Sequence, residues 1–351
     1  MNWKSISDLN RDIKRWIPEL PDDLDLIVGI PRSGLLVANL LALYLNLPLT
    51  DVEGLCEGRI LQAGRRCERD VDLSKKCKVL VVDDSVASGF QMQHIKAQIK
   101  RHRLPHQIYY GALYVTPLGT KYVDFWYELI GLPRVFEWNV MHSDILLKSC
   151  VDLDGVLCRD PTEEENDDGL KYMEFIKFVK PLIIPSKTIG YIVTTRLEKY
   201  RKETEEWLKR HRIKYNYLVM LNLPDKKTRQ ALGIHAEFKA GFYKSKNTVL
   251  FIESSLSQAI EIAKISGKPV LCTETWELIK PGKVDEIRSK IRQMPSDIGF
   301  LLNRFLIELK NDPIKAFRLS YRYLFMKVEN KLLRFTIRFK KLSKCRPGED
   351  K

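Results

Sequence analysis

Two neighbouring carboxylates, Asp83 and Asp84, provide the first clear chemistry in the sequence. They follow a short apolar run, Val79–Val82, and precede a turn of small residues, Ser85–Gly89. Paired carboxylates can accept hydrogen bonds from two neighbouring hydroxyl groups. Free backbone N–H groups in the turn and at the start of a following helix can hold a phosphate. A ribose 5-phosphate, which carries a phosphate at one end and a vicinal diol nearby, would match this pattern.

The residues around the acidic pair predict the elements that would position it. Val79–Val82 is wholly apolar, which is typical of a buried parallel strand. After the turn, Met92, Ile95 and Ile99 fall on one face of a predicted helix. The sequence therefore predicts a strand, a tight loop and a helix, with the two carboxylates at the end of the strand.

A second strand–loop–helix pattern comes earlier in the chain. Leu24–Ile30 predicts a buried strand, and Leu35–Leu45 predicts an apolar helix. Between them lies the loop Pro31-Arg32-Ser33-Gly34, which places an arginine beside a helix N-terminus. Because the arginine and the free N–H groups both attract negative charge, we expect an anion site here.

The stretch Lys78–Lys100 closely resembles the phosphoribosyl pyrophosphate (PRPP) binding motif of type I phosphoribosyltransferases. The resemblance implies that Asp83 and Asp84 hold the ribose hydroxyls. It assigns the 5-phosphate to Ala87, Ser88, Gly89, Phe90 and Gln91, and the pyrophosphate to Arg32, Ser33 and Gly34. Gln91 departs from the pattern, since the family usually has Thr or Ser there. The alternative is an ordinary turn in which the two acids are solvated.

Two further segments extend this resemblance. The polar stretch 53–78 matches the position of a mobile loop, whose arginines would screen a departing pyrophosphate: Arg59, Arg65, Arg66 and Arg69. The sequence Phe136-Glu137-Trp138 resembles the aromatic segment of the hood that covers the acceptor. A solvated hairpin and a tryptophan that serves only the core are the alternatives.

A second pair of carboxylates, Asp152 and Asp154, follows a predicted strand, Leu147–Val151. Residues at positions i and i+2 at a strand end point the same way, so both can approach one cation and one phosphorus atom. One carboxylate could attack the phosphorus while the other gives a proton to the leaving oxygen. The pattern predicts phosphomonoester hydrolysis.

The pattern Asp152-Leu153-Asp154-Gly155-Val156-Leu157 resembles motif I of the haloacid dehalogenase (HAD) superfamily. The resemblance makes Thr194 the phosphate contact of motif II and Lys239 the lysine of motif III. It implies an Mg²⁺ ion held by Asp152, Asp154 and Glu253, although Ser254 stands where the family usually has a second acid. A HAD-like fold without activity is the alternative. The histidines, including His142 and His235, follow no ligand-like spacing.

Composition places the chain among ordinary globular proteins. With 351 residues, 44% hydrophobic and 30% charged, it is long enough for two domains. It has no run of apolar residues long enough to span a membrane and no signal-peptide core at its N-terminus. Seven scattered cysteines without a CxxC pair predict free thiols and a cytoplasmic location.

The net charge of +14 is concentrated near the C-terminus. Between Pro313 and Arg346, eleven Lys or Arg residues stand against the single acid Glu329, a net charge of +10. Apolar residues from Ile314 to Phe339 recur every three or four positions, which predicts a basic amphipathic helix. We expect it to lie on an anionic membrane surface, with packing against the domains as the alternative and no nucleic acid as partner.

Together these patterns predict two doubly wound parallel-sheet α/β domains and a helical basic tail. The expected boundaries are residues 1–145 for a phosphoribosyltransferase-like domain, 146–282 for a HAD-like phosphatase domain, and 283–351 for the tail. The combination resembles bifunctional enzymes that transfer phosphoribose from PRPP to a glycan acceptor and then remove the 5-phosphate, which leaves ribofuranose in bacterial surface polysaccharide. We expect the acceptor to be lipid-linked. Alternatives are a nucleobase phosphoribosyltransferase with nucleotide phosphatase activity, and a non-catalytic PRPP sensor.

Overall fold

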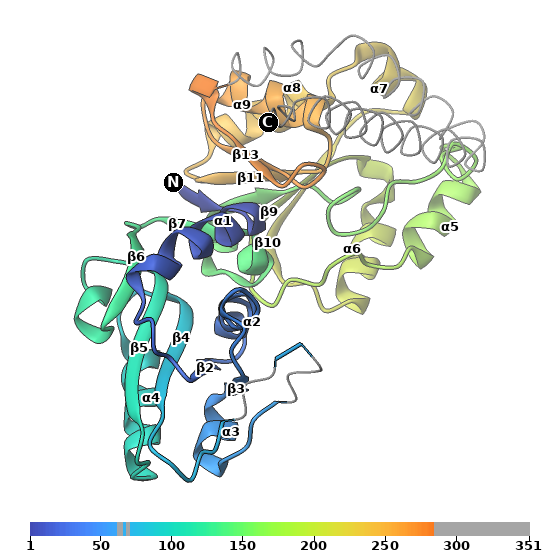
Figure 1. Ribbon diagram of the computed structural model, residues 1–351. Helices are drawn as coiled ribbons and strands as arrows, with labels where there is room; N and C mark the ends of the chain where they lie inside the picture. The colour runs from blue at the N-terminus through green and yellow to red at the C-terminus, as the bar shows by residue number, and fades with distance from the viewer. Residues whose placement is uncertain (62–65, 68–70, 284–351) are drawn as a thin grey trace, which may run out of the picture. The chain divides into compact units, whose positions relative to one another are not determined.

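The computed structural model of the 351-residue chain describes residues 1–61, 66–67 and 71–283 (Figure 1). The unit Met1–Pro281 holds two separate sheets of mostly parallel strands, which confirms the α/β class with parallel sheets. A short parallel pair, β1 (Asn2–Lys4) and β7 (Arg134–Phe136), lies outside them. The expected domain boundaries stay predictions.

The first sheet has five parallel strands in the order β3-β2-β4-β5-β6. In the same part of the chain, helix α1 contacts α2, and α3 contacts α4. The strands are β2 (Leu26–Gly29), β3 (Leu49–Asp51), β4 (Lys78–Val86), β5 (Gln107–Val115) and β6 (Phe125–Leu129), and the helices are α1 (Ile6–Trp16), α2 (Ser33–Leu45), α3 (Val52–Glu57) and α4 (Phe90–Arg101).

Both faces of the first sheet are covered, because successive residues of a strand point to opposite faces. In β4, Leu80 and Val82 pack in the core that contains α1 and α2. Val79 and Val81 pack in a second core with α3 and α4. This explains why the run is apolar throughout.

The strand β4 is longer than the sequence predicts. It continues through Asp83 and Asp84 to Val86, because its backbone pairs with β5 as far as Val115. The acidic pair therefore lies in the last part of the strand and not after it. The helix α4 begins at Phe90, so Phe90 and Gln91 belong to its first turn.

The second sheet has six strands in the order β10-β9-β8-β11-β12-β13, of which only β13 is antiparallel to its neighbour. Its strands are β8 (Ser149–Val151), β9 (Ile189–Leu197), β10 (Tyr215–Leu221), β11 (Leu250–Glu253), β12 (Val270–Cys272) and β13 (Glu277–Ile279). Helix α5 lies beside α6 and α8 lies beside α9 (Figure 1). The helices are α5 (Leu170–Phe178), α6 (Arg201–Arg210), α7 (Lys226–Leu232), α8 (His235–Ser245) and α9 (Leu256–Ser266).

Side-chain caps set the start of two of the helices near the second sheet, α7 and α9. Asp225 accepts a hydrogen bond from the Thr228 N–H at 2.7 Å and begins α7. Ser255 caps α9 in the same way through Gln258. Short 3₁₀ helices complete the described part: Ile17–Glu19, Gly119–Tyr122, Glu137–His142, Asp144–Lys148, Glu198–Tyr200 and Pro281–Lys283.

Several expectations concern residues that the structure does not describe. The basic tail helix and the arginines Arg65 and Arg69 lie outside the described residues. Within residues 1–61, 66–67 and 71–283, no helix is long and apolar enough to cross a membrane. The six described cysteines are all free thiols, as predicted.

Candidate active sites

The first site joins the two loops that the sequence singled out. Ser33, at the start of α2, donates its hydroxyl hydrogen bond to Asp84 Oδ1 at 2.7 Å, across 51 positions of sequence. Asp83 and Asp84 are buried, with 8% and 3% exposure, and Gly34 is buried beside them. Arg32 caps the same helix and is exposed, so its guanidinium group is open to a ligand.

An aromatic stack formed by Trp138, Phe136 and Tyr114 reaches the acidic pair. Trp138 Nε1 donates to Asp84 Oδ2 at 2.8 Å, so this tryptophan contacts the site and does not serve only the core. Its ring stacks on Phe136 at 4.9 Å, and Phe136 stacks on Tyr114 at 5.5 Å. With Ser33 on one oxygen and Trp138 on the other, the carboxylate of Asp84 has a defined orientation.

The predicted phosphate loop follows directly after β4. Gly89 adopts φ +77°, and a Cβ atom there would meet the ring of Tyr122 at 2.0 Å, so only glycine fits. Thr116 donates to the Ala87 carbonyl at 2.7 Å and holds the loop against the end of β5. Ser88, Phe90 and Gln91 are exposed, and the first N–H groups of α4 have no partner within the helix.

Burial and neighbouring charges shift the pKa values of two residues at the first site, Asp83 and Arg134. Burial and the neighbouring Asp84 raise the pKa of Asp83 well above its usual range. Burial lowers the pKa of Arg134, against the opposing charges of Asp84 and Asp83. Arg134 Nη1 is buried without a hydrogen-bond partner among the described residues. Sequence reasoning missed Arg134, because its distance from the acidic pair along the chain gives no local signal.

The second site is built around Lys239. Its ammonium group lies 2.6 Å from Asp152 Oδ2 and 2.7 Å from Glu253 Oε2, and all three side chains are buried. Asp152 follows β8, Glu253 ends β11 and Lys239 comes from α8. Burial lowers the pKa of Lys239, but the charges of Asp152 and Glu253 outweigh this and raise it. The structure thus brings together three residues predicted from separate motifs.

Asp154 has a different partner. Arg196 Nη2 lies 2.6 Å from Asp154 Oδ1 and Arg196 Nε lies 2.9 Å from Asp154 Oδ2. Arg196 stands in the last part of β9, two residues after Thr194, and its side chain is fully buried. Gly155, at φ +77°, lets the chain turn sharply after Asp154, where a Cβ atom would meet Ser254 Oγ at 2.2 Å. Arg196 stood beside Thr194 in the sequence, but nothing there assigned it a partner.

A cavity of about 280 Å³ opens onto the second site. Asp152, Asp154, Thr194 and Lys239 line it, so four predicted residues face one space. The sequence analysis gave no role to several other residues that line it: Asp160, Asn166, Tyr172, Arg229, His235 and Gln258. His235 Nδ1 lies 3.1 Å from Thr195 Oγ1, and burial lowers its pKa, with Arg229 and Lys239 acting in the same direction.

The fit of Mg²⁺ depends on the carboxylates of this second site. Among the described residues, no group of three or more His, Cys, Asp or Glu side chains is arranged to hold a metal ion. The oxygens of Asp152 and Glu253 are nevertheless the ligands that Mg²⁺ prefers. Burial raises the pKa of Asp152 to about 8, despite the opposing charge of Lys239. A cation would offset this excess of negative charge, so the donor chemistry fits the ion.

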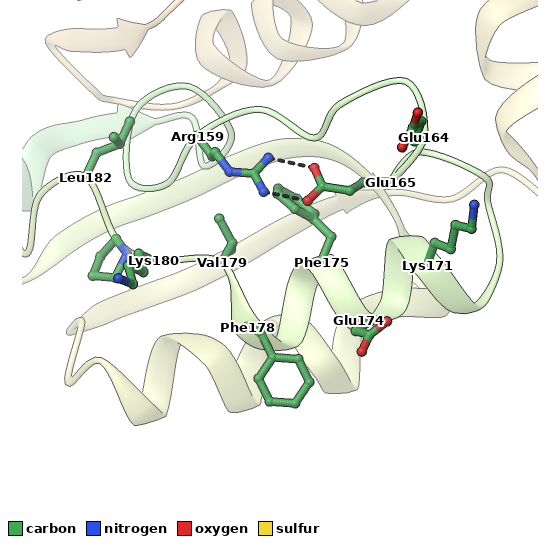
Figure 2. A pocket seen from close by; sticks show the side chains of 11 residues that line it. Arg159, Glu164, Glu165, Lys171, Glu174, Phe175, Phe178, Val179, Lys180 and Leu182 are labelled. Carbon is green, nitrogen blue, oxygen red and sulfur yellow. Dashed lines mark hydrogen bonds and ion pairs between the residues drawn. The ribbon is translucent and has the colours of Figure 1, made fainter.

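A larger cavity of about 910 Å³ lies beside α5 (Figure 2). Arg159 forms two contacts with Glu165 there, at 2.6 and 2.5 Å, as the dashed lines in Figure 2 show. Phe178 also lines this cavity and is exposed to solvent. None of the predicted site residues lines this cavity, so we assign the chemistry to the smaller one.

No family model matches the sequence, and no curated protein matches it. Similar solved structures include a Helicobacter pylori xanthine-guanine-hypoxanthine phosphoribosyltransferase, 16% identical, covering 40% of this chain and 92% of that chain at a TM-score of 0.31. A Pyrococcus horikoshii purine phosphoribosyltransferase is 21% identical, over 39% of this chain and 92% of that chain, at a TM-score of 0.30. Leishmania donovani UMP synthase is 18% identical, covering 38% of this chain and 27% of that chain, at a TM-score of 0.24. Likenesses at this level do not identify a substrate.

Proposed function

We propose that the chain is a bifunctional enzyme that transfers 5-phosphoribosyl from PRPP to an acceptor and then hydrolyses the 5-phosphate. The observation that carries the proposal is the presence of two separate acidic sites, each near the ends of parallel strands. Asp83 and Asp84 mark the first site, and Asp152 with Lys239 marks the second. In open α/β sheets, ligands bind beside the carboxyl ends of the strands.

In the transfer step, the first site binds PRPP through both ends of the ribose phosphate. Asp83 and Asp84 accept hydrogen bonds from the ribose hydroxyls, and the N–H groups from Ala87 to Gln91 hold the 5-phosphate. The bond from C1 to the pyrophosphate oxygen breaks as the acceptor hydroxyl oxygen attacks C1, and the hydroxyl proton passes to water. Arg32, Ser33 and Gly34 bind the pyrophosphate as it leaves. Mg²⁺ brought by PRPP would offset part of its charge.

In the hydrolysis step, an oxygen of Asp152 attacks phosphorus and the ester oxygen leaves. Thr194 and Lys239 hold the phosphate oxygens, and Asp154 gives a proton to the leaving alkoxide. Asp154 then takes a proton from the water that hydrolyses the acyl phosphate. Asp152 and Glu253 would hold Mg²⁺, which would offset charge on the phosphate. Asp154, predicted as a third ligand, has both side-chain oxygens on Arg196 instead. Arg196 fixes the orientation of the Asp154 carboxyl group.

The order of the two reactions supports a glycan acceptor. An enzyme of nucleotide synthesis gains little by removing the phosphate from its own product. A glycan gains a plain ribofuranose, which is the unit needed in a surface polysaccharide. We propose a lipid-linked glycan as acceptor, since the basic segment 313–346 would attract the chain to an anionic membrane surface.

Mass spectrometry of acceptors incubated with PRPP and Mg²⁺ tests this function. We expect wild type to add a bare pentose to a glycan acceptor, and Asp152→Asn to add a phosphopentose. Pyrophosphate release with nucleobases alone would indicate a salvage enzyme instead. Release with neither class of acceptor, together with PRPP binding, would indicate a PRPP sensor and overturn the proposal.

A further inference from the structure

Arg229 is a buried cation that the proposed mechanism does not use. Its residue exposure is 9%, and it lines the same 280 Å³ cavity as Asp152 and Lys239. Its Nε atom is buried and has no hydrogen-bond partner among the described residues. No described ion pair joins it to a carboxylate at 4.0 Å or less. A buried guanidinium without a negative partner is costly in free energy, so an anion is the missing component.

The fold anchors this guanidinium next to the proposed phosphate contact. Arg229 Nη1 donates to the Thr195 carbonyl oxygen at 2.8 Å, one residue beyond Thr194 on β9. The short helix α7 supplies the residue, and its start is fixed by the Asp225 cap. The anchoring bond uses one N–H of the guanidinium, Tyr172 also interacts with the group, and the buried Nε–H has no partner. Arg229 therefore has a fixed place in the lining of the cavity and an incompletely paired guanidinium.

We propose that Arg229 binds a non-bridging oxygen of the phosphate group that Asp152 attacks. This inference rests on the proposed phosphatase function and assigns the site a preference for dianionic phosphomonoesters over singly charged diesters. The guanidinium donates an N–H to the phosphate while Nη1 stays on Thr195. Charge-assisted hydrogen bonds of this kind are about twice as strong as neutral ones. Because Arg229 contacts the phosphate of the bound substrate, its loss should chiefly weaken substrate binding.

The first test is steady-state hydrolysis of para-nitrophenyl phosphate by the full chain with Mg²⁺. We expect Arg229→Gln to raise KM roughly 10- to 100-fold with a smaller change in kcat. Arg229→Lys keeps the positive charge but lacks the several N–H groups of a guanidinium. Its KM should therefore lie between those of wild type and Arg229→Gln. Lys227→Gln removes an exposed charge from the same helix and should match wild type. An unchanged KM in Arg229→Gln, or a loss confined to kcat, would overturn the inference.

Binding of inorganic phosphate separates this inference from the proposed activity. Isothermal titration calorimetry should find at least tenfold weaker phosphate binding in Arg229→Gln than in wild type, and added guanidinium should partly restore it in Arg229→Ala. If wild type hydrolyses no phosphomonoester but binds phosphate through Arg229, the activity fails and the inference stands. Equal phosphate affinity in wild type and Arg229→Gln, or no binding by either, would overturn it. Circular dichroism identifies any variant that fails to fold, and Arg229→Lys then decides the outcome.

Discussion

Arg196 and Asp154 form a two-pronged ion pair, with Arg196 Nη2 2.6 Å from Asp154 Oδ1 and Arg196 Nε 2.9 Å from Asp154 Oδ2. The arginine side chain is fully buried and that of the aspartate is 18% exposed. The two residues are 42 positions apart and come from a strand and from the turn after a neighbouring strand. Both oxygens of the proposed acid–base residue are therefore held in one orientation. Burial lowers the pKa of Arg196, but Asp154 outweighs burial and raises it, which is the sign expected for a stabilising pair.

Removing the arginine should destabilise the fold and the site together. Arg196→Met leaves Asp154 without its partner, and breaking a buried pair in this way typically costs about 3–5 kcal/mol. Urea unfolding should detect this loss. The control Arg201→Met removes an arginine that is paired at the surface with Glu198, where exposed pairs contribute about 0–1 kcal/mol. Equal stability of the two variants would contradict the prediction.

The phosphatase step should depend on pH through Asp152. Burial raises the pKa of Asp152 to about 8, and attack on phosphorus requires the ionised carboxylate. Below that pKa, kcat/KM should therefore rise about tenfold per pH unit and level off above it. Added Mg²⁺ should move the rising limb to lower pH, because a nearby cation favours the carboxylate. A profile that stays flat as pH approaches 8 without added Mg²⁺ would contradict this assignment.

The first site can be tested by binding alone. Asp84→Asn should weaken PRPP binding roughly tenfold or more, since hydrogen bonds to a charged group contribute about 1.5–3 kcal/mol. Calorimetric titration with PRPP and Mg²⁺ measures the change. Asp22→Asn alters an exposed carboxylate at the other end of the first sheet's β2 and should bind PRPP as wild type does. Equal affinity in both variants would exclude Asp84 as a ribose contact.

Thiol reactivity should follow burial in the second sheet. Cys150 is fully buried in β8, and burial raises its pKa to about 12, so little reactive thiolate forms at neutral pH. Cys67 is partly exposed and should be alkylated much faster in the native protein. Peptide mass spectrometry after timed alkylation measures both rates, and urea should make them similar. Rapid native labelling of Cys150 would contradict the described core.

Local patterns predicted much of what lies within each strand–loop–helix unit. Val79–Val82 and Leu24–Ile30 were identified as buried strands because apolar runs are a property of adjacent residues. Strand ends were less predictable. Hydrogen-bonded pairing with β5 extends β4 past Asp84 to Val86. The residues near Asp84 do not predict this pairing, because it depends on a strand that is distant in the sequence.

The sequence by itself determined which residues are candidates for chemistry: the acidic pairs, the glycine loops, Thr194 and Lys239. Their partners were decided by tertiary structure. Asp84 meets Ser33 and Trp138, and Asp154 meets Arg196, only once parallel strands from distant parts of the chain lie side by side. The residues next to Arg229 in the sequence do not predict its role, since its side chain donates to the distant Thr195 carbonyl of β9 only in the folded chain. Periodicity and propensity act over a few residues, whereas burial and charge pairing depend on contacts that the folded chain alone creates.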